Sequence, residues 1–186
     1  MSSCNLIRNP LRNLIQAHSM KSVIHRAVLF VSLVLLSACS PKFDWRDARS
    51  NDAPYTILMP GKPMSDSKDL QLEGISLKMS MLAGEAGGIS FAVGSTRAED
   101  AGKAGLIMEA MKKGMINNIQ GTAETTKTTA PDTVEVRGKL RNGQPIMMVG
   151  RFLIRGPWVY QIVMLGQEKD MKQEVTDTFM TSFKTH

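Results

Sequence analysis

Cysteine and histidine are the side chains of this sequence that could act as a nucleophile, a general base or a zinc ligand. The chain holds two cysteines and three histidines: Cys4, Cys39, His18, His25 and His186. A cysteine thiolate paired with a histidine can attack a carbonyl carbon, and several such side chains together can bind zinc. Their use therefore depends on which of them remain in the functional protein.

Cys39 directly follows the three parts of a secretory signal. Met20–Arg26 is a basic n-region, Ala27–Leu36 is an apolar h-region, and small residues precede the cysteine. The run Leu36-Ser37-Ala38-Cys39 resembles the lipobox of bacterial lipoproteins. The resemblance implies that a signal peptidase recognises Leu36, Ser37 and Ala38, cuts before Cys39, and leaves lipid on the cysteine sulfur. Two or more acyl chains would anchor the protein stably in a membrane.

An uncleaved transmembrane helix is the alternative interpretation of this segment. The apolar stretch 23–38 is shorter than the roughly 20 residues that a spanning helix needs, and His25 and Arg26 interrupt it. We therefore interpret residues 1–38 as a signal peptide. Residues 1–19 are unusual for such a signal, and we interpret them as an artefact of an upstream start site, with the true start at Met20.

Cleavage before Cys39 would remove most of the reactive groups. The mature chain would keep His186 as its one histidine and a single cysteine, whose sulfur would carry lipid. Disulfides, Cys/His metal sites and Cys/His or Ser/His catalysis within one chain are then excluded. The mature chain would also keep 19 of the 23 basic residues and all 17 acidic ones, so the net charge of +6 falls to +2. We therefore expect no catalytic, cofactor or metal residues and no nucleic-acid partner.

Methionine and charged side chains are the remaining candidates for binding chemistry. The spacing of Met79 to Met81 and of Met108 to Met111 could offer thioethers to Cu(I), but these methionines fall on predicted core faces. A loop with Asp66, Asp69 and Glu73 and a helix start with Glu99 and Asp100 could bind a cation. Basic residues on late strands could meet anionic lipid or peptidoglycan: Arg137, Lys139, Arg141, Arg151 and Arg155. We favour core packing for the methionines and ordinary solvated surfaces for the charges.

The elements that would position these residues begin after a polar segment. Residues 39–54 are charged and without periodicity, and they predict a lipid-anchored tether. Phe43 and Trp45 interrupt this polarity, either as an interfacial anchor or by packing back on the domain. Residues 55–184 then form one globular domain, since the 148 residues after the signal suffice for a single core.

Periodicity predicts strands, a long helix, a meander and a terminal helix. Thr96 and Glu99 have the form of a capping box that opens the long helix, which continues to Asn118. Asn142-Gly143 is the strongest hairpin signal. The predicted strands cover 55–59, 69–73, 75–82, 89–94, 133–140, 145–154 and 157–165, and the terminal helix covers 168–183. This order predicts an α+β fold, a mostly antiparallel sheet covered by two helices.

Three stretches of this domain resemble a set of bacterial envelope proteins with the PsbP-like fold. They are the turn Pro60-Gly61-Lys62-Pro63, the strand Trp158–Ile162 and the closing segment Phe179–Lys184. The resemblance spans about Tyr55 to Lys184 and implies an antiparallel sheet between helices. Members of that fold act as adaptors or assembly factors, but fold alone does not give function.

These observations together favour a lipid-anchored protein that is not an enzyme. We expect an interaction or assembly module of the cell envelope that binds the membrane through lipid on Cys39 and also contacts an envelope protein. A small-ligand or metal-binding lipoprotein is the alternative. Ser40 follows the cysteine where inner-membrane lipoproteins often carry aspartate, which implies an outer-membrane location facing the periplasm.

Overall fold

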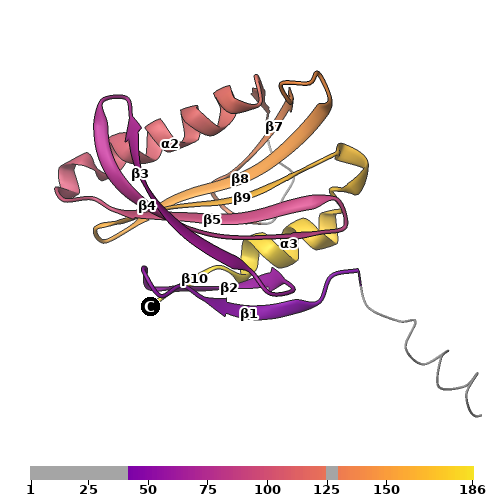
Figure 1. Ribbon diagram of the computed structural model, residues 1–186, viewed down its shortest axis with the longest axis horizontal. Coiled ribbons are helices and arrows are strands. Elements are labelled where there is room, and N and C mark those ends of the chain that lie inside the picture. The colour runs from indigo at the N-terminus through magenta and orange to yellow at the C-terminus, as the bar shows by residue number, and fades with distance from the viewer. Residues whose placement is uncertain (1–41, 125–129) are drawn as a thin grey trace, which may run out of the picture. The chain divides into compact units, whose positions relative to one another are not determined.

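The computed structural model of the chain describes residues 42–124 and 130–186. The predicted signal peptide, Leu36, Ser37, Ala38 and Cys39 lie outside the described residues. The described part has the predicted fold class, because a mostly antiparallel sheet is covered by helices (Figure 1).

Seven of the described strands form one antiparallel sheet in the order β3-β4-β5-β9-β8-β7-β6. β9 lies in the interior of this sheet and is covered on both faces, which explains its almost continuous apolar sequence. Tight turns with glycine at positive φ join β4 to β5 at Gly87-Gly88 and β7 to β8 at Asn142-Gly143. The strands are β3 (Met64–Leu72), β4 (Ile75–Ala86), β5 (Ile89–Arg97), β6 (Thr122–Glu124), β7 (Thr133–Lys139), β8 (Pro145–Arg155) and β9 (Trp158–Gly166).

A second, small sheet has the order β1-β2-β10 and lies on the same side of the large sheet as the last helix (Figure 1). Its strands are β1 (Trp45–Arg49), β2 (Tyr55–Pro60) and β10 (Lys184–Thr185). The prediction that residues 39–54 form a tether is therefore wrong from Trp45 onward. β1 pairs with β2 over its whole length, and Ala48 and Ala53 are buried in the core. Phe43 and Trp45 pack back on the domain, as one of the two interpretations expected.

The helices cover opposite faces of the large sheet. Helix α2 (Ala104–Asn118), preceded by the short 3₁₀ helix η1 (Ala101–Lys103), packs over β8 and β9. Helix α3 (Gln173–Ser182), preceded by η2 (Glu168–Asp170), shares the other face with the small sheet. The largest hydrophobic core lies on this second face, where Phe179 of α3 contacts Phe91 of β5 with ring centroids 5.1 Å apart.

The start of the long helix differs from the prediction. Thr96 and Glu99 do not form a capping box, because β5 continues to Arg97 through its pairing with β9. The turn begins instead at Asp100, whose carboxylate accepts a hydrogen bond from the main-chain N–H of Gly102. The spacing of small and apolar residues predicts a buried stripe on this helix through Ala101, Gly105, Met108, Met111, Met115 and Ile119. The buried face of α2 instead consists of Ala104, Ile107, Ala110 and Met111, so only Met111 is common to both.

Candidate functional site

A cleft of about 610 Å³ opens where β4 leaves β5. The two strands pair from Ala86 with Ile89 as far as Ser80 with Ser95, and there the pairing stops. β4 continues beside β3 toward Ile75, whereas β5 continues beside β9 to Arg97. The strands therefore diverge, and the start of α2 lies near the opening. Its volume lies within the range of small-molecule sites.

Two buried hydroxyls lie at the point of divergence. Thr96 donates a hydrogen bond of 2.8 Å to the main-chain carbonyl of Lys78, and Ser95 lies 3.5 Å from the carbonyl of Ser80. Both side chains are 1% exposed although both line the cleft. The Thr96 bond takes the place of a ladder bond between the separating strands and joins β5 to β4 at the base of the cleft.

Charged side chains surround the opening. Lys78, Arg97 and Lys103 bring three positive charges, whereas Asp52 and Glu99 bring two negative ones. Among the residues that the structure describes, none of the three cations forms an ion pair. Other basic residues on this surface do so, as Lys113 does with Glu73 at 3.0 Å.

Apolar side chains also line the cleft. Leu106 of α2 lines the cleft and is 64% exposed; within the described residues, Met64 is the other large hydrophobic side chain with such exposure. Trp158 lies half-buried at the end of β9, and its ring stacks on Tyr160 with centroids 6.4 Å apart. Ile75, Leu77 and Ile107 complete this apolar lining. The cleft thus combines an apolar surface with cations at its rim.

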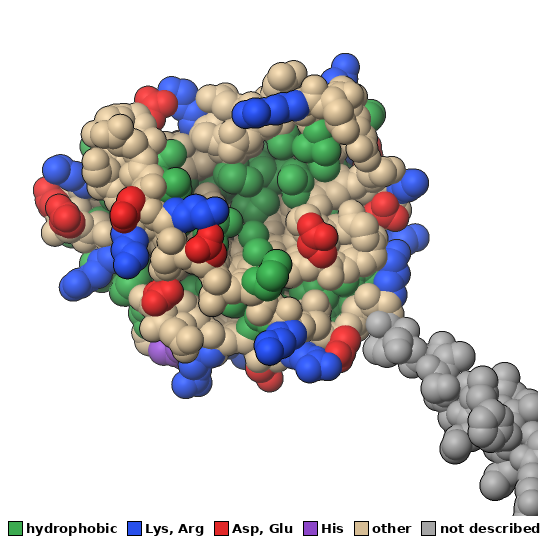
Figure 2. All heavy atoms as spheres, viewed as in Figure 1, with side chains coloured by type: hydrophobic (Ala, Val, Ile, Leu, Met, Phe, Trp, Pro, Cys, Tyr) green, Lys and Arg blue, Asp and Glu red, His purple; other side chains and the backbone are tan. Residues whose placement is uncertain are grey.

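The methionine pairs lie on the other side of the sheet from α3, under α2. The structure brings all four together in one cluster, with Met79 and Met111 buried and Met81 and Met108 partly buried. The amide of Gln161 lies 3.9 Å from the sulfur of Met79. Figure 2 shows hydrophobic side chains gathered in a hollow beside α2. The position of the four methionines in one core cluster agrees with the packing role that we favoured for them.

The acidic residues expected to lie close together are separated. Asp66 forms an ion pair with Lys68 at 3.1 Å, which lowers the pKa of Asp66 below its usual value. Glu73 pairs with Lys113 of α2 instead, and Glu99 lies at the cleft. Within residues 42–124 and 130–186, no group of three His, Cys, Asp or Glu side chains is arranged to hold a metal ion.

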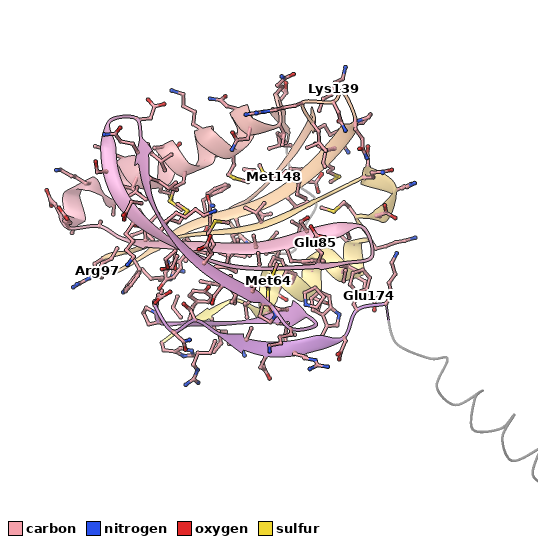
Figure 3. All side chains as sticks on the ribbon, in the orientation of Figure 1. Met64, Glu85, Arg97, Lys139, Met148 and Glu174 are labelled. Atoms are coloured by element: carbon pink, nitrogen blue, oxygen red, sulfur yellow. The ribbon has the colours of Figure 1, made fainter. Side chains whose placement is uncertain are left out.

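The basic residues of the late strands do not form a common free surface. Arg137 pairs with Glu168 at 2.7 Å, and the hydrogen bond from Arg137 lowers the pKa of that glutamate. Arg151 is partly buried and donates to the carbonyl of Met180 in α3 at 3.2 Å. Lys139 and Arg141 are exposed near the hairpin (Figure 3). His186 is exposed, with its main-chain N–H donating to the carbonyl of Pro54.

Sequence reasoning missed the cleft and most of its lining. Lys78, Arg97 and Lys103 fall on two strands and a helix start, and nothing in their spacing indicates that they converge. Leu106 offers a signal in the sequence, because it is an apolar residue that falls between the predicted stripe positions Gly105 and Met108.

No protein-family model matches this chain, and no curated protein matches it at a significant level of sequence similarity. In the described part of the chain, no helix has the length and apolar character needed to cross a bilayer.

Proposed function

We propose that the protein is a bacterial lipoprotein, held to a membrane of the cell envelope by lipid on Cys39, and that its domain is a non-enzymatic interaction module. The sequence around Cys39 supports the anchor, and the resemblance of three sequence stretches to proteins of the PsbP-like fold supports an adaptor role. The proposed location is the outer membrane, facing the periplasm.

The run Leu36-Ser37-Ala38-Cys39 after an apolar segment carries the proposed anchor, and the early start of the folded domain supports a module held at the membrane. Strand β1 begins at Trp45, only six residues after Cys39. Six residues reach at most about 20 Å when fully extended. Lipid on Cys39 would therefore hold the small sheet close to the membrane, rather than on a tether of about 50 Å. A module placed in this way would meet partners that are themselves at the membrane.

Metabolic labelling with an alkyne analogue of palmitate tests the anchor. We expect the wild-type chain to be labelled and to fractionate with membranes, and we expect Cys39→Ala to lose both properties. Cys4→Ala is the matched control, because it removes the other cysteine of the chain. Labelling that survives in Cys39→Ala, or that is lost in Cys4→Ala, contradicts the proposal. A chain that begins at Met20 should be labelled as the full chain is.

Site-specific photocrosslinking in cells tests the interaction role. A photoreactive residue at Leu106 lies at the cleft, and one at Glu174 of α3 lies at the far end of the domain from Arg97 (Figure 3). We expect one crosslinked product at Leu106 and a different product or none at Glu174. A chain that crosslinks to nothing at either position speaks against an interaction module.

A small-ligand-binding lipoprotein is the second candidate, and the 610 Å³ cleft favours it. Metal binding would instead use the thioethers of Met79, Met81, Met108 and Met111, which lie together in the core under α2. Native mass spectrometry with Cu(I), Ca²⁺ and Mn²⁺ separates these possibilities. The absence of a mass shift at micromolar metal rules out the metal site and leaves the ligand cleft.

A further inference from the structure

We propose that the cleft between the β3–β4 hairpin, the end of β5 and the start of α2 binds a small amphipathic anion. The anionic group would lie among Lys78, Arg97 and Lys103, and the apolar body would lie against Leu106 and Trp158. This inference deepens the binding role proposed above and does not depend on the lipid anchor.

The charge distribution argues for an anion. Three cations line the cleft, and none of them forms an ion pair among the described residues although Asp52 and Glu99 line the same cleft. The carboxylate of Asp52 instead accepts a hydrogen bond of 3.4 Å from the hydroxyl of Ser67. The cations thus keep their donors available. Charge-assisted hydrogen bonds to a phosphate, sulfonate or carboxylate are about twice as strong as neutral ones.

The apolar lining argues against a purely inorganic anion. Leu106 is 64% exposed, so a ligand that covers it removes apolar surface from water. Trp158 is half-buried and already stacks on Tyr160 on one side, which holds its indole in place. A fixed aromatic side chain binds a flat or aliphatic body at little entropic cost. Charge and apolar surface within one cleft therefore select a molecule that has both.

The architecture makes this cleft a preformed site. The Thr96 hydroxyl ties β5 to the carbonyl of Lys78, so the two walls are joined by a buried hydrogen bond. Asp100 fixes the start of the helical segment that carries Lys103 and Leu106 through its bond to Gly102. A preformed site loses less conformational entropy when it binds a ligand.

Isothermal titration calorimetry of the full chain in dodecyl maltoside micelles tests the inference, with empty micelles subtracted. The probe is 2-naphthyl phosphate. We expect saturable binding at one site per chain, and binding at least about tenfold weaker for inorganic phosphate, which lacks the apolar body. 2-Naphthyltrimethylammonium carries the same ring with a positive charge and should not bind measurably. Equal binding of the cationic probe, or of inorganic phosphate, overturns the inference.

Charge reversal locates the binding in the cleft. Arg97→Glu should weaken binding of 2-naphthyl phosphate by about tenfold or more. Lys139→Glu is the matched control, because Lys139 is exposed on β7 at the far end of the sheet (Figure 3). Arg97→Gln serves if the reversed charge impairs folding. Equal affinities of the Arg97 and Lys139 variants overturn the site. The mass of the same sample reports whether Cys39 carries lipid, so a failed cleft and a failed anchor are told apart.

Discussion

The hydroxyl of Thr96 donates a hydrogen bond of 2.8 Å to the main-chain carbonyl of Lys78, at the point where β4 and β5 stop pairing. Thr96 is 1% exposed, so this bond satisfies a polar group that water does not reach. A side chain here replaces the main-chain bond that the diverging strands no longer form. The cleft depends on it, because its two walls meet at this contact.

Thr96→Val should therefore destabilise the domain. Valine keeps the shape of threonine but lacks the hydroxyl donor. The carbonyl of Lys78 then loses this hydrogen bond, which lowers the free energy of unfolding by about 1–3 kcal/mol. Denaturation by urea measures the loss. Thr56→Val is the control, because Thr56 lies on β2 and its side chain makes no hydrogen bond within the described residues. The control should change stability by less than about 0.5 kcal/mol. Equal losses in the two variants would contradict the role of the Thr96 bond.

The sequence indicated the local parts of this fold and missed the parts that distant pairing decides. Asn142-Gly143 encodes the β7–β8 hairpin within a few residues, and the apolar run of β9 marks a strand covered on both faces. Thr96 has the residue type and spacing of a helix cap, yet pairing with β9 extends β5 through it. The cleft follows from where the β4–β5 register ends, which no local pattern records.

The burial of Tyr160 and Tyr55 predicts that the free energy of unfolding falls at high pH. Burial raises the pKa of Tyr160 to about 12, and burial likewise raises that of Tyr55, although a hydrogen bond with Ser50 opposes it. In the unfolded chain these tyrosines ionise near pH 10. Their contribution to the stability of the folded state is therefore complete below pH 10 and is lost as the pH rises toward 12. At pH 11 each tyrosine should contribute a loss of roughly 1 kcal/mol.

Substituting each tyrosine separates these effects. The hydroxyl of Tyr160 has no hydrogen-bond partner among the described residues, so Tyr160→Phe should be neutral or up to about 1 kcal/mol more stable at pH 8. Tyr55→Phe loses its contact with Ser50 and should be less stable at that pH. Both variants should lose less stability than the wild type between pH 8 and pH 11. A Tyr160→Phe variant that is clearly destabilised at pH 8 would indicate a partner for that hydroxyl.

Trp45 tests whether the segment before β2 belongs to the fold. Its ring contacts Phe91 of β5 edge to face at 5.7 Å and stacks on Phe43 at the same centroid distance. Trp45→Ala should lower the free energy of unfolding by about 2–3 kcal/mol, less than for a fully buried tryptophan. Asp47 is exposed on β1, and Asp47→Ala should therefore have little effect. If both variants unfold at the same denaturant concentration, this segment is a tether after all.

Gly138 on β7 is expected to tolerate no side chain, because it lies against the end of α2. A Cβ atom there would collide with the main-chain oxygen of Ile119, which also accepts a hydrogen bond of 2.6 Å from the N–H of Lys139. Gly138→Ala must therefore push the helix end away from β7 and weaken that bond, at a cost of about 2 kcal/mol or more.

Gly114 provides the opposite case, within helix α2 itself. A Cβ atom at Gly114 meets no atom within 4 Å, and the residue lies in the interior of α2. Gly114→Ala should therefore stabilise the domain by about 0.5–1 kcal/mol, since alanine loses less backbone entropy than glycine on entering a helix. Thermal unfolding of both variants measures the contrast. Two glycines of one helix–strand unit should thus shift stability in opposite directions, and a Gly138→Ala variant as stable as Gly114→Ala would mean that α2 does not end against β7.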